Sequence, residues 1–211
     1  MKHTLNLHVL SFALASSLLI SACTGNKQES TGNENEVHHM EKMKTDSSTQ
    51  SVAVKAFENV DASVKTQLNG FLSDYFALNK ALIEDNQETA KAAAKKLAET
   101  INKFDMRNLA GEQMDFYHKQ LATLTVSLKA ISESSDIEET RADLSAISES
   151  MYALVKAYQP NAAELYYQFC PMAKNGDGAN WLSETKEVVN PYMGQRMLKC
   201  GTTKEVLTFV K

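Results

Sequence analysis

The chain has 211 residues with a formal net charge of −4 at pH 7, and 43% of its residues are hydrophobic. The mildly acidic balance argues against a nucleic-acid partner, because such proteins need a basic stripe. The length leaves room for one domain with a substantial core. Beyond the N-terminal region, no apolar run is long enough to predict a transmembrane helix.

Residues 1–22 have the features of a lipoprotein signal peptide. One lysine near the start precedes an apolar stretch from about Val9 to Ile20, which is too short to span a bilayer comfortably. The residues before Cys23 fit a lipoprotein cleavage box, so Cys23 is expected to become the lipidated first residue of the mature chain. Acyl chains contribute roughly 0.8 kcal/mol per buried methylene to membrane binding. We therefore expect a lipid-anchored protein of the periplasm or cell envelope. The alternative is an ordinary secretory signal in which Cys23 is incidental.

Residues 23–56 predict a disordered tether, because they are rich in polar and small residues and have almost nothing to bury. Within it, "HHMEKM" gathers four candidate ligands: His38, His39, Met40 and Met43. Packing does not explain methionines in a segment without a core. Adjacent imidazoles suit Cu(II) or zinc, and thioethers suit Cu(I). The alternative is a chance cluster on a polar linker.

Residues 57–159 have the pattern of a helical bundle. Apolar residues recur every three or four positions in four stretches, 64–82, 90–104, 114–131 and 137–158. Ser135 and Glu138 have the spacing of a capping box that opens the fourth helix, and Pro160 ends it. Four helices with short connections predict an antiparallel four-helix bundle, so the fold class is mainly α.

Residues 160–211 predict a small irregular cap packed on the bundle. The segments "ELYYQFC" (164–170) and "EVLTFV" (205–210) have the β-branched and aromatic content of short strands, and "KNGDGAN" (174–180) has the residues of a turn. A short β-hairpin is the regular structure that fits such a cap. Because so short a cap has little core of its own, we expect a local feature to hold it together.

Four sulfur side chains in the cap are candidate metal ligands: Cys170, Met172, Met197 and Cys200. Thiolate and thioether sulfurs select soft ions, above all Cu(I), because their polarizable lone pairs match a polarizable ion. In this interpretation the cysteines supply anionic ligands and the methionines neutral ones. Pro171 is expected to stiffen the turn so that Cys170 and Met172 both point inward.

The same cysteines have a simpler interpretation as a disulfide, since cysteines outside the cytoplasm usually pair. Closing a loop of about 31 residues would stabilise the cap by roughly 3 to 4 kcal/mol in the chain-entropy model. A third alternative is a zinc site that joins both cysteines to His118. His118 is the only histidine of the predicted bundle. A lone histidine facing a bundle or its edge is more often a packed residue than a ligand.

The cap sequence "YYQFCPMAKNGDGANWLSETKEVVNPYMGQRMLKCG" resembles the signature of an uncharacterised extracytoplasmic family, reading roughly YYxxCPMA, GAxWLS and NPYxGxxMLxCG. The resemblance extends from about Phe71 onward. Members of that family are similar to periplasmic lipoproteins or are fused to Cus-type heavy-metal efflux adaptors. Carried over position by position, the resemblance implies that the motif's soft residues are Cys170, Met172, Met197 and Cys200. It implies more loosely that His118 matches a histidine on the third helix.

These observations lead to one expected function and one alternative. We expect a membrane-anchored periplasmic heavy-metal-binding protein for copper as Cu(I), with zinc or silver as other candidate ions. It would sequester copper or silver, or deliver them to a heavy-metal efflux adaptor or another periplasmic metal protein. The chain has no phosphate-cradling glycine loop, nucleophile elbow or zinc-protease helix motif, so we do not expect an enzyme. The alternative is a non-metal structural or interaction module stapled by a Cys170–Cys200 disulfide.

Overall fold

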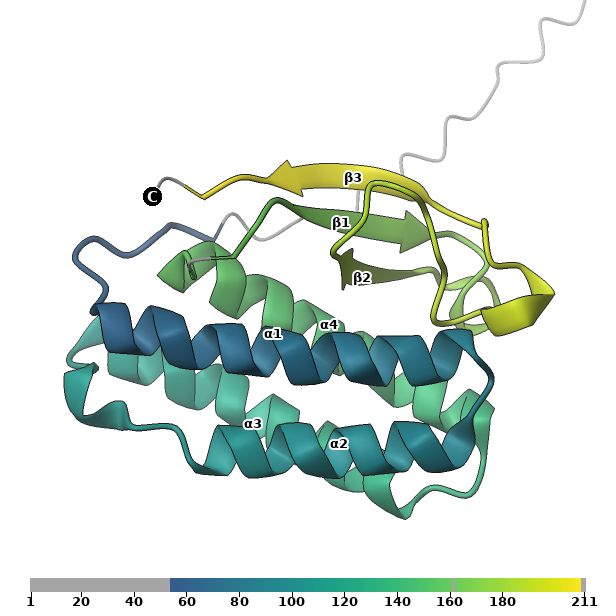
Figure 1. Cartoon of the computed structure of the whole chain (residues 1–211), viewed down its shortest axis with the longest axis horizontal. Helices are drawn as coiled ribbons and strands as arrows, with labels where there is room; N and C mark the ends of the chain where they lie inside the picture. The colour runs from purple at the N-terminus through teal and green to yellow at the C-terminus, as the bar shows by residue number, and fades with distance from the viewer. Residues whose placement is uncertain (1–53, 161, 210–211) are drawn as a thin grey trace, which may run out of the picture. The chain divides into compact units, whose positions relative to one another are not determined.

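The structure is a computed structural model that describes residues 54–160 and 162–209 (Figure 1). The predicted signal peptide, the lipidation site Cys23 and the tether's His38, His39, Met40 and Met43 lie outside the described residues. Among the described residues, no helix combines the length and the apolar character that a membrane span requires.

Four long helices come first along the chain, followed by three short strands. The elements are α1 (Ala62–Ile83), α2 (Gln87–Asn102), α3 (Glu112–Glu133), α4 (Ile137–Tyr158), β1 (Leu165–Cys170), β2 (Ala179–Ser183) and β3 (Thr202–Leu207). Short 3-10 helices occur in the connections: η1 (Met106–Asn108), η2 (Lys174–Gly176) and η3 (Gly194–Arg196). This confirms the predicted fold class, a mainly α protein with a small cap after the bundle.

Three of the four helices begin where polar side chains cap their first turns, whereas α3 begins after Gly111 without such a cap. Asp61, Asn86 and Asp136 each accept a hydrogen bond from a backbone N–H in the first turn of α1, α2 and α4. Such caps satisfy N–H groups that have no partner within the helix. The expectation that Ser135 caps α4 was wrong. Asp136, one residue later, takes the position, and its carboxylate accepts from the N–H of Glu138 at 2.7 Å.

The bundle core is formed by the apolar stripes that the periodicity predicts. Leu78, Leu97, Leu128 and Leu144, one from each helix, are at most 1% exposed. The helical pattern was expected from about Phe57, but α1 begins at Ala62. The residues before it run along the end of α4 with a bend at residues 58 and 59, and the Phe57 N–H bonds to the Ala157 carbonyl at 2.8 Å.

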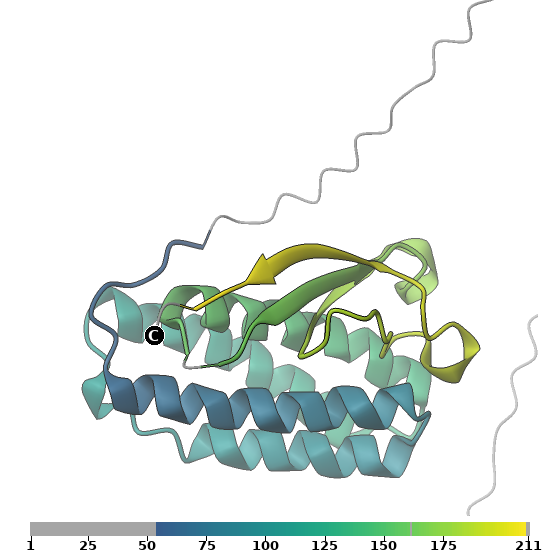
Figure 2. The same ribbon diagram turned by 45° about the horizontal axis from the view of Figure 1, so that its top comes forward.

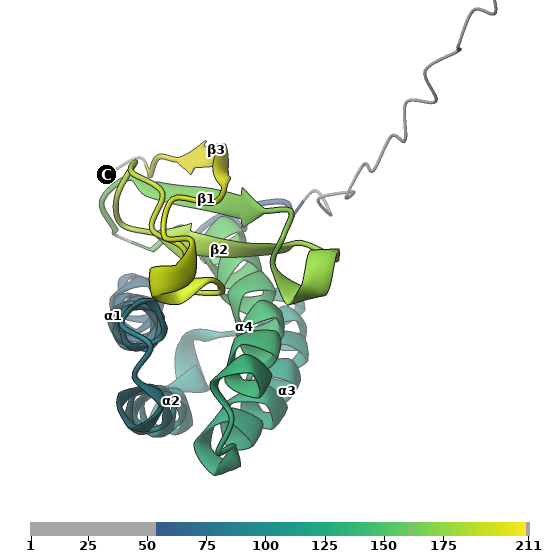
Figure 3. The same cartoon turned by 90° about the vertical axis from the view of Figure 1, so that its right-hand side faces the viewer.

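The three strands form one antiparallel sheet in the order β2-β1-β3. Figures 1 and 3 show the sheet lying over α1 and α4, with α2 and α3 on the far side of the bundle. Figure 2 brings the sheet forward and shows β1 and β3 crossing above the helices. Tyr167 of β1 faces α4, since its ring stacks on Tyr152 at 3.9 Å between centroids and its hydroxyl donates to Glu149 at 2.8 Å.

The strand β2 was missed, because its first residues were interpreted as part of a turn. Helix side chains make this edge strand possible by satisfying its outward backbone groups. The Leu182 N–H donates to the Tyr75 hydroxyl at 3.1 Å, and the Leu182 carbonyl accepts from Asn79 at 3.2 Å. The Tyr192 hydroxyl donates to the Asn180 carbonyl at 2.7 Å. The edge of β2 is thereby sealed against α1, and the cap contains a three-stranded sheet rather than a hairpin.

Candidate functional site

The two cysteines of the cap meet on the face of the sheet that points away from the helices. Side chains alternate along a strand, so Cys170 lies on the face opposite to Tyr167. The segment 184–201 covers that face, with backbone carbonyls of residues 185–187 accepting hydrogen bonds from Gln168. Cys200 stands near the end of this segment. Its sulfur lies 2.7 Å from that of Cys170, so the two sulfurs are in direct contact.

Both predicted methionine ligands have backbone hydrogen bonds to Cys200. The Met172 N–H donates to the Cys200 sulfur, and the Met197 carbonyl accepts from the Cys200 N–H at 3.0 Å. Their side chains are 51% and 38% exposed, respectively. The expectation that Cys170 and Met172 both point inward was therefore wrong for Met172. The chain leaves β1 at Pro171 and enters a turn, which directs the next side chain toward solvent.

The buried face around the thiols is aromatic. Trp181 of β2 pairs with Gln168 in the sheet register, so its ring shares the face of Cys170, and it is 1% exposed. A side chain at Gly201 would place its Cβ 2.9 Å from the Trp181 ring and 2.8 Å from the Phe169 carbonyl oxygen. The φ of Gly201 is +143°, a conformation that favours glycine. The residue after Cys200 must therefore be glycine for the chain to pass over the tryptophan.

The contact with Cys170 controls the acidity of Cys200. The hydrogen bond that the protonated Cys200 thiol donates to Cys170, followed by burial, raises the pKa of the Cys200 thiol to about 11, although the Met172 N–H acts in the opposite direction. This thiol is consequently protonated at neutral pH. Any metal ion that binds it must displace the proton, so binding at this sulfur would strengthen as the pH rises.

Asn190 organises the segment that carries Cys200. It is fully buried, and its amide donates to the Cys200 carbonyl at 2.7 Å. Its side-chain oxygen accepts from the N–H groups of Tyr192 and Met193 at 2.8 and 3.1 Å. A buried asparagine with all of these bonds holds the loop in one conformation.

His118 does not join the sulfur cluster. It is exposed on the second turn of α3, with its ring centroid 6.3 Å from that of Tyr117. In the antiparallel bundle, α3 begins at the opposite end from the α1–α2 turn, which the cap segment contacts through Gln195. Among the described residues, no group of three or more histidine, cysteine, aspartate and glutamate side chains is placed to hold a metal ion.

A groove on the far side of the bundle is separate from this chemistry. It has a volume of about 360 Å³ and lies between α2 and α3, where its lining includes Lys95, Ile101, Leu128 and Lys129. None of the candidate sulfur ligands contributes to it.

Together, the fold and the site define a four-helix bundle protein whose sheet cap brings Cys170 and Cys200 into contact. Residues 71–163 match the model of a family described as "Protein of unknown function (DUF3347)". No curated protein and no solved structure matches the chain. The matched segment runs from α1 through α4 and stops before β1, so the four sulfur residues lie outside it. The match therefore covers most of the helical part of the chain and does not include the cap.

Proposed function

We propose that this protein is a membrane-anchored periplasmic protein that binds a soft metal ion, Cu(I) in the first place, and has no catalytic turnover. The observation that supports the proposal is the convergence of Cys170 and Cys200, which are 30 positions apart and have their sulfurs in direct contact. Met172 and Met197 contact Cys200 through their backbones, which brings both residues to the same part of the cap. Two thiolates and two thioethers form a donor set that a soft d10 ion prefers, and silver as Ag(I) has the same preference.

The exposure of the site favours transfer of the ion. Cys170 is fully buried at the end of a strand, whereas Cys200 is partly exposed and both methionines reach solvent. An incoming thiolate or thioether of a partner could bind the ion from the open side before Cys170 releases it. We therefore propose delivery of the ion to a heavy-metal efflux adaptor or another periplasmic metal protein by ligand exchange.

Metal binding requires a small rearrangement at the thiols. Two thiolates that bind one tetrahedral ion with the bond length of zinc, about 2.3 Å, lie roughly 3.8 Å apart. The two sulfurs are 2.7 Å apart, so they must separate to hold an ion between them. Cys170 belongs to a strand paired on both sides, whereas Cys200 stands just before β3. The movement is therefore expected on the side of Cys200.

The location rests on the sequence alone. Lipidation at Cys23 would hold the protein on a membrane surface, and residues 24–56 would let the folded part reach partners above it. His38, His39, Met40 and Met43 would provide a second, weaker site that captures ions for the cap. These residues lie outside the described part of the chain, so only binding measurements can test this role.

A second candidate function is favoured by the contact between the two sulfurs. Sulfurs in contact can be oxidised to a disulfide, and disulfides persist in the oxidising periplasm. The cap would then be a stapled module, and the bundle would dock onto an envelope partner. Alkylation of free thiols distinguishes the metal-binding function from the stapled module. In freshly isolated, metal-stripped protein that has not been reduced, alkylation of both Cys170 and Cys200 supports the metal site. Resistance of both to alkylation supports the staple.

The identity of the metal is tested by replacing the thioethers. In a Met172→Leu, Met197→Leu double variant, a Cu(I) site is expected to lose at least tenfold in affinity, because soft ligands contribute to binding this ion. A zinc site formed with other ligands would keep its affinity. Leucine has a similar volume and apolar character, so the variant changes the donors with little effect on packing.

A further inference from the structure

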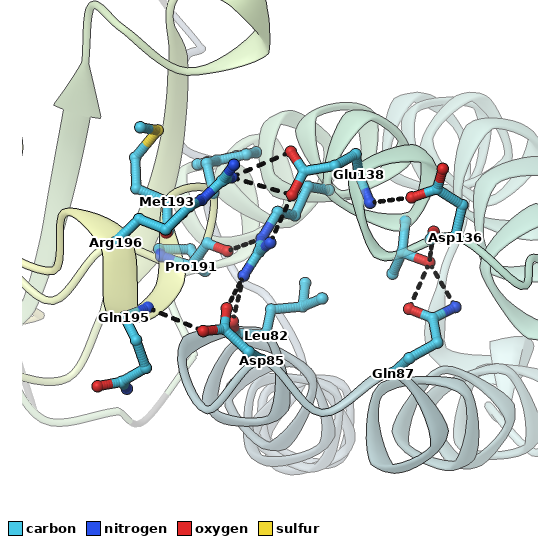
Figure 4. A network of polar contacts seen from close by, with 12 residues as sticks. Leu82, Asp85, Gln87, Asp136, Glu138, Pro191, Met193, Gln195 and Arg196 are labelled. Carbon is cyan, nitrogen blue, oxygen red and sulfur yellow. Dashed lines mark hydrogen bonds and ion pairs between the residues drawn. The ribbon is translucent and has the colours of Figure 1, made fainter.

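A buried arginine connects the bundle to the segment that carries Cys200. Arg141 of α4 is 4% exposed and forms ion pairs with Asp85, in the α1–α2 turn, and with Glu138 at 2.7 Å. It also donates to the Leu82 carbonyl at 2.8 Å and to the Pro191 carbonyl at 3.1 Å. Figure 4 shows Asp85, Glu138 and Pro191 converging on this point from three parts of the chain.

The backbone of the cap segment rests directly on this ion pair. A Cβ atom at Gly194 would lie 2.3 Å from Nη2 of Arg141 and would overlap the Asp85 carboxylate. The Gln195 N–H donates to the same carboxylate at 3.2 Å, and its side chain donates to the Ile83 carbonyl at 2.8 Å. The close approach explains why residue 194 is glycine, whose φ here is +53°.

A continuous series of hydrogen bonds leads from this contact to Cys200. The Met197 N–H donates to the Gly194 carbonyl at 3.3 Å, and the Cys200 N–H donates to the Met197 carbonyl at 3.0 Å. On the other side, Pro191 follows Asn190, whose amide holds the Cys200 carbonyl at 2.7 Å. The position of the Cys200 sulfur therefore depends on where the turn of residues 190–196 is held.

We propose that Arg141, Asp85 and Gly194 form a clamp that positions Cys200 against Cys170. The clamp acts from the bundle, while β1 fixes Cys170 and the pairing of β3 restrains only the C-terminal side of Cys200. Charge-assisted hydrogen bonds to a buried arginine are among the stronger polar contacts in proteins, and the arginine has partners on three segments. The bundle therefore helps to hold the two cysteine sulfurs in position. The importance of the clamp for metal binding rests on the proposed function, but the positioning of Cys200 by the clamp does not.

The test measures how readily the two thiols form a disulfide. The full chain, purified in a mild detergent, is equilibrated with glutathione buffers of defined redox ratio. Differential alkylation and mass spectrometry of the Cys170 and Cys200 peptides then give the dithiol–disulfide equilibrium constant. Arg141→Gln and Gly194→Ala disturb the clamp from its two sides. Each substitution is expected to lower the equilibrium ratio of disulfide to dithiol about tenfold. The double variant is expected to lower this ratio little further, because both substitutions remove the same contact. Arg141→Lys, which keeps the charge, is expected to lose less.

Lys199→Gln is the matched control, since it removes an exposed ion pair with Glu187 one residue from Cys200. It is expected to leave the constant within twofold. An unchanged constant in both clamp variants, or an equal loss in the control, would overturn the proposal. Circular dichroism verifies that each variant is folded, and Gly194→Ala keeps the test valid if Arg141→Gln does not fold. The constant is measured without metal, so a failure of copper binding and a failure of the clamp are separate results.

Discussion

Removal of the Tyr75 hydroxyl is expected to destabilise the protein by breaking the seal between α1 and the sheet. Tyr75 is fully buried, and its hydroxyl lies 2.8 Å from the Ser148 Oγ while accepting the Leu182 N–H at 3.1 Å. Phenylalanine at this position keeps the ring and loses both bonds. Ser148 retains the Tyr192 hydroxyl at 3.3 Å, but the Leu182 N–H is left without that acceptor.

The expected magnitude follows from these two losses. A buried N–H left without a partner costs about 1 to 3 kcal/mol, and a lost hydrogen bond whose other partner is rescued costs about 1 kcal/mol. We therefore expect Tyr75→Phe to lower the free energy of unfolding by about 2 to 4 kcal/mol. Urea unfolding of the soluble chain from Thr24 onward, followed by circular dichroism and linear extrapolation, measures this change.

The chain provides a matched control in Tyr117. This residue is also buried, at 2% exposure, but its hydroxyl has no hydrogen-bond partner among the described residues. The Tyr117→Phe variant removes a buried hydroxyl that forms no hydrogen bond with the described residues. It is expected to leave stability unchanged or to raise it by up to about 1 kcal/mol. Equal losses in the two variants would refute the reasoning, because burial alone would then explain the cost.

Three further predictions concern charge, the thiols and a glycine. Burial opposes the charge of Asp85, but hydrogen bonds and the charge of Arg141 outweigh it and lower the pKa of Asp85. Its ion pair therefore stabilises the fold above the ordinary carboxyl range and is lost as the pH falls through the lowered pKa. The difference in urea midpoint between the wild type and Asp85→Asn should shrink below about pH 4. If Cys200 is a Cu(I) ligand as proposed, it must lose its proton to bind, so chelator competition should show an affinity that rises about tenfold per pH unit between about pH 6 and 8 from this thiol alone. Gly201→Ala would force a Cβ to 2.9 Å from the Trp181 ring. It should lower the free energy of unfolding, measured in urea, by about 2 to 4 kcal/mol. A loss below about 0.5 kcal/mol would contradict this packing.

The helices were predictable because each buries one stripe, and a stripe leaves a periodic signal in a single stretch of sequence. The strand β1 was predictable from its aromatic content. In contrast, β2 depends on Tyr75, which is 107 positions from Leu182. No local pattern in a segment that begins with turn residues reveals that a distant tyrosine will satisfy its backbone. The missed strand is a tertiary effect, in which a helix side chain overrides local propensity.

The sulfur residues were identified from their chemistry, but their arrangement was only partly predictable. Spacing cannot show that Cys170 and Cys200 touch, or that Met172 turns outward while its neighbour two positions earlier is buried. One signal for the clamp was present in the sequence. Arg141 occupies a core position in the apolar stripe of α4, and a charge at such a position requires buried partners. The pattern could not identify the partners, because Asp85 and Pro191 lie 56 and 50 positions away.

An anaerobic Cu(I) titration tests the proposed function most directly. The reduced soluble chain from Thr24 onward competes with a chromophoric chelator, beside Cys170→Ser, Cys200→Ser and a variant lacking His38, His39, Met40 and Met43. We predict uptake of one ion that the chelator removes only in large excess, with a loss of at least tenfold in affinity in either serine variant. If the wild type cannot compete with even a weak chelator and the serine variants lose only stability, the cap is not a copper site.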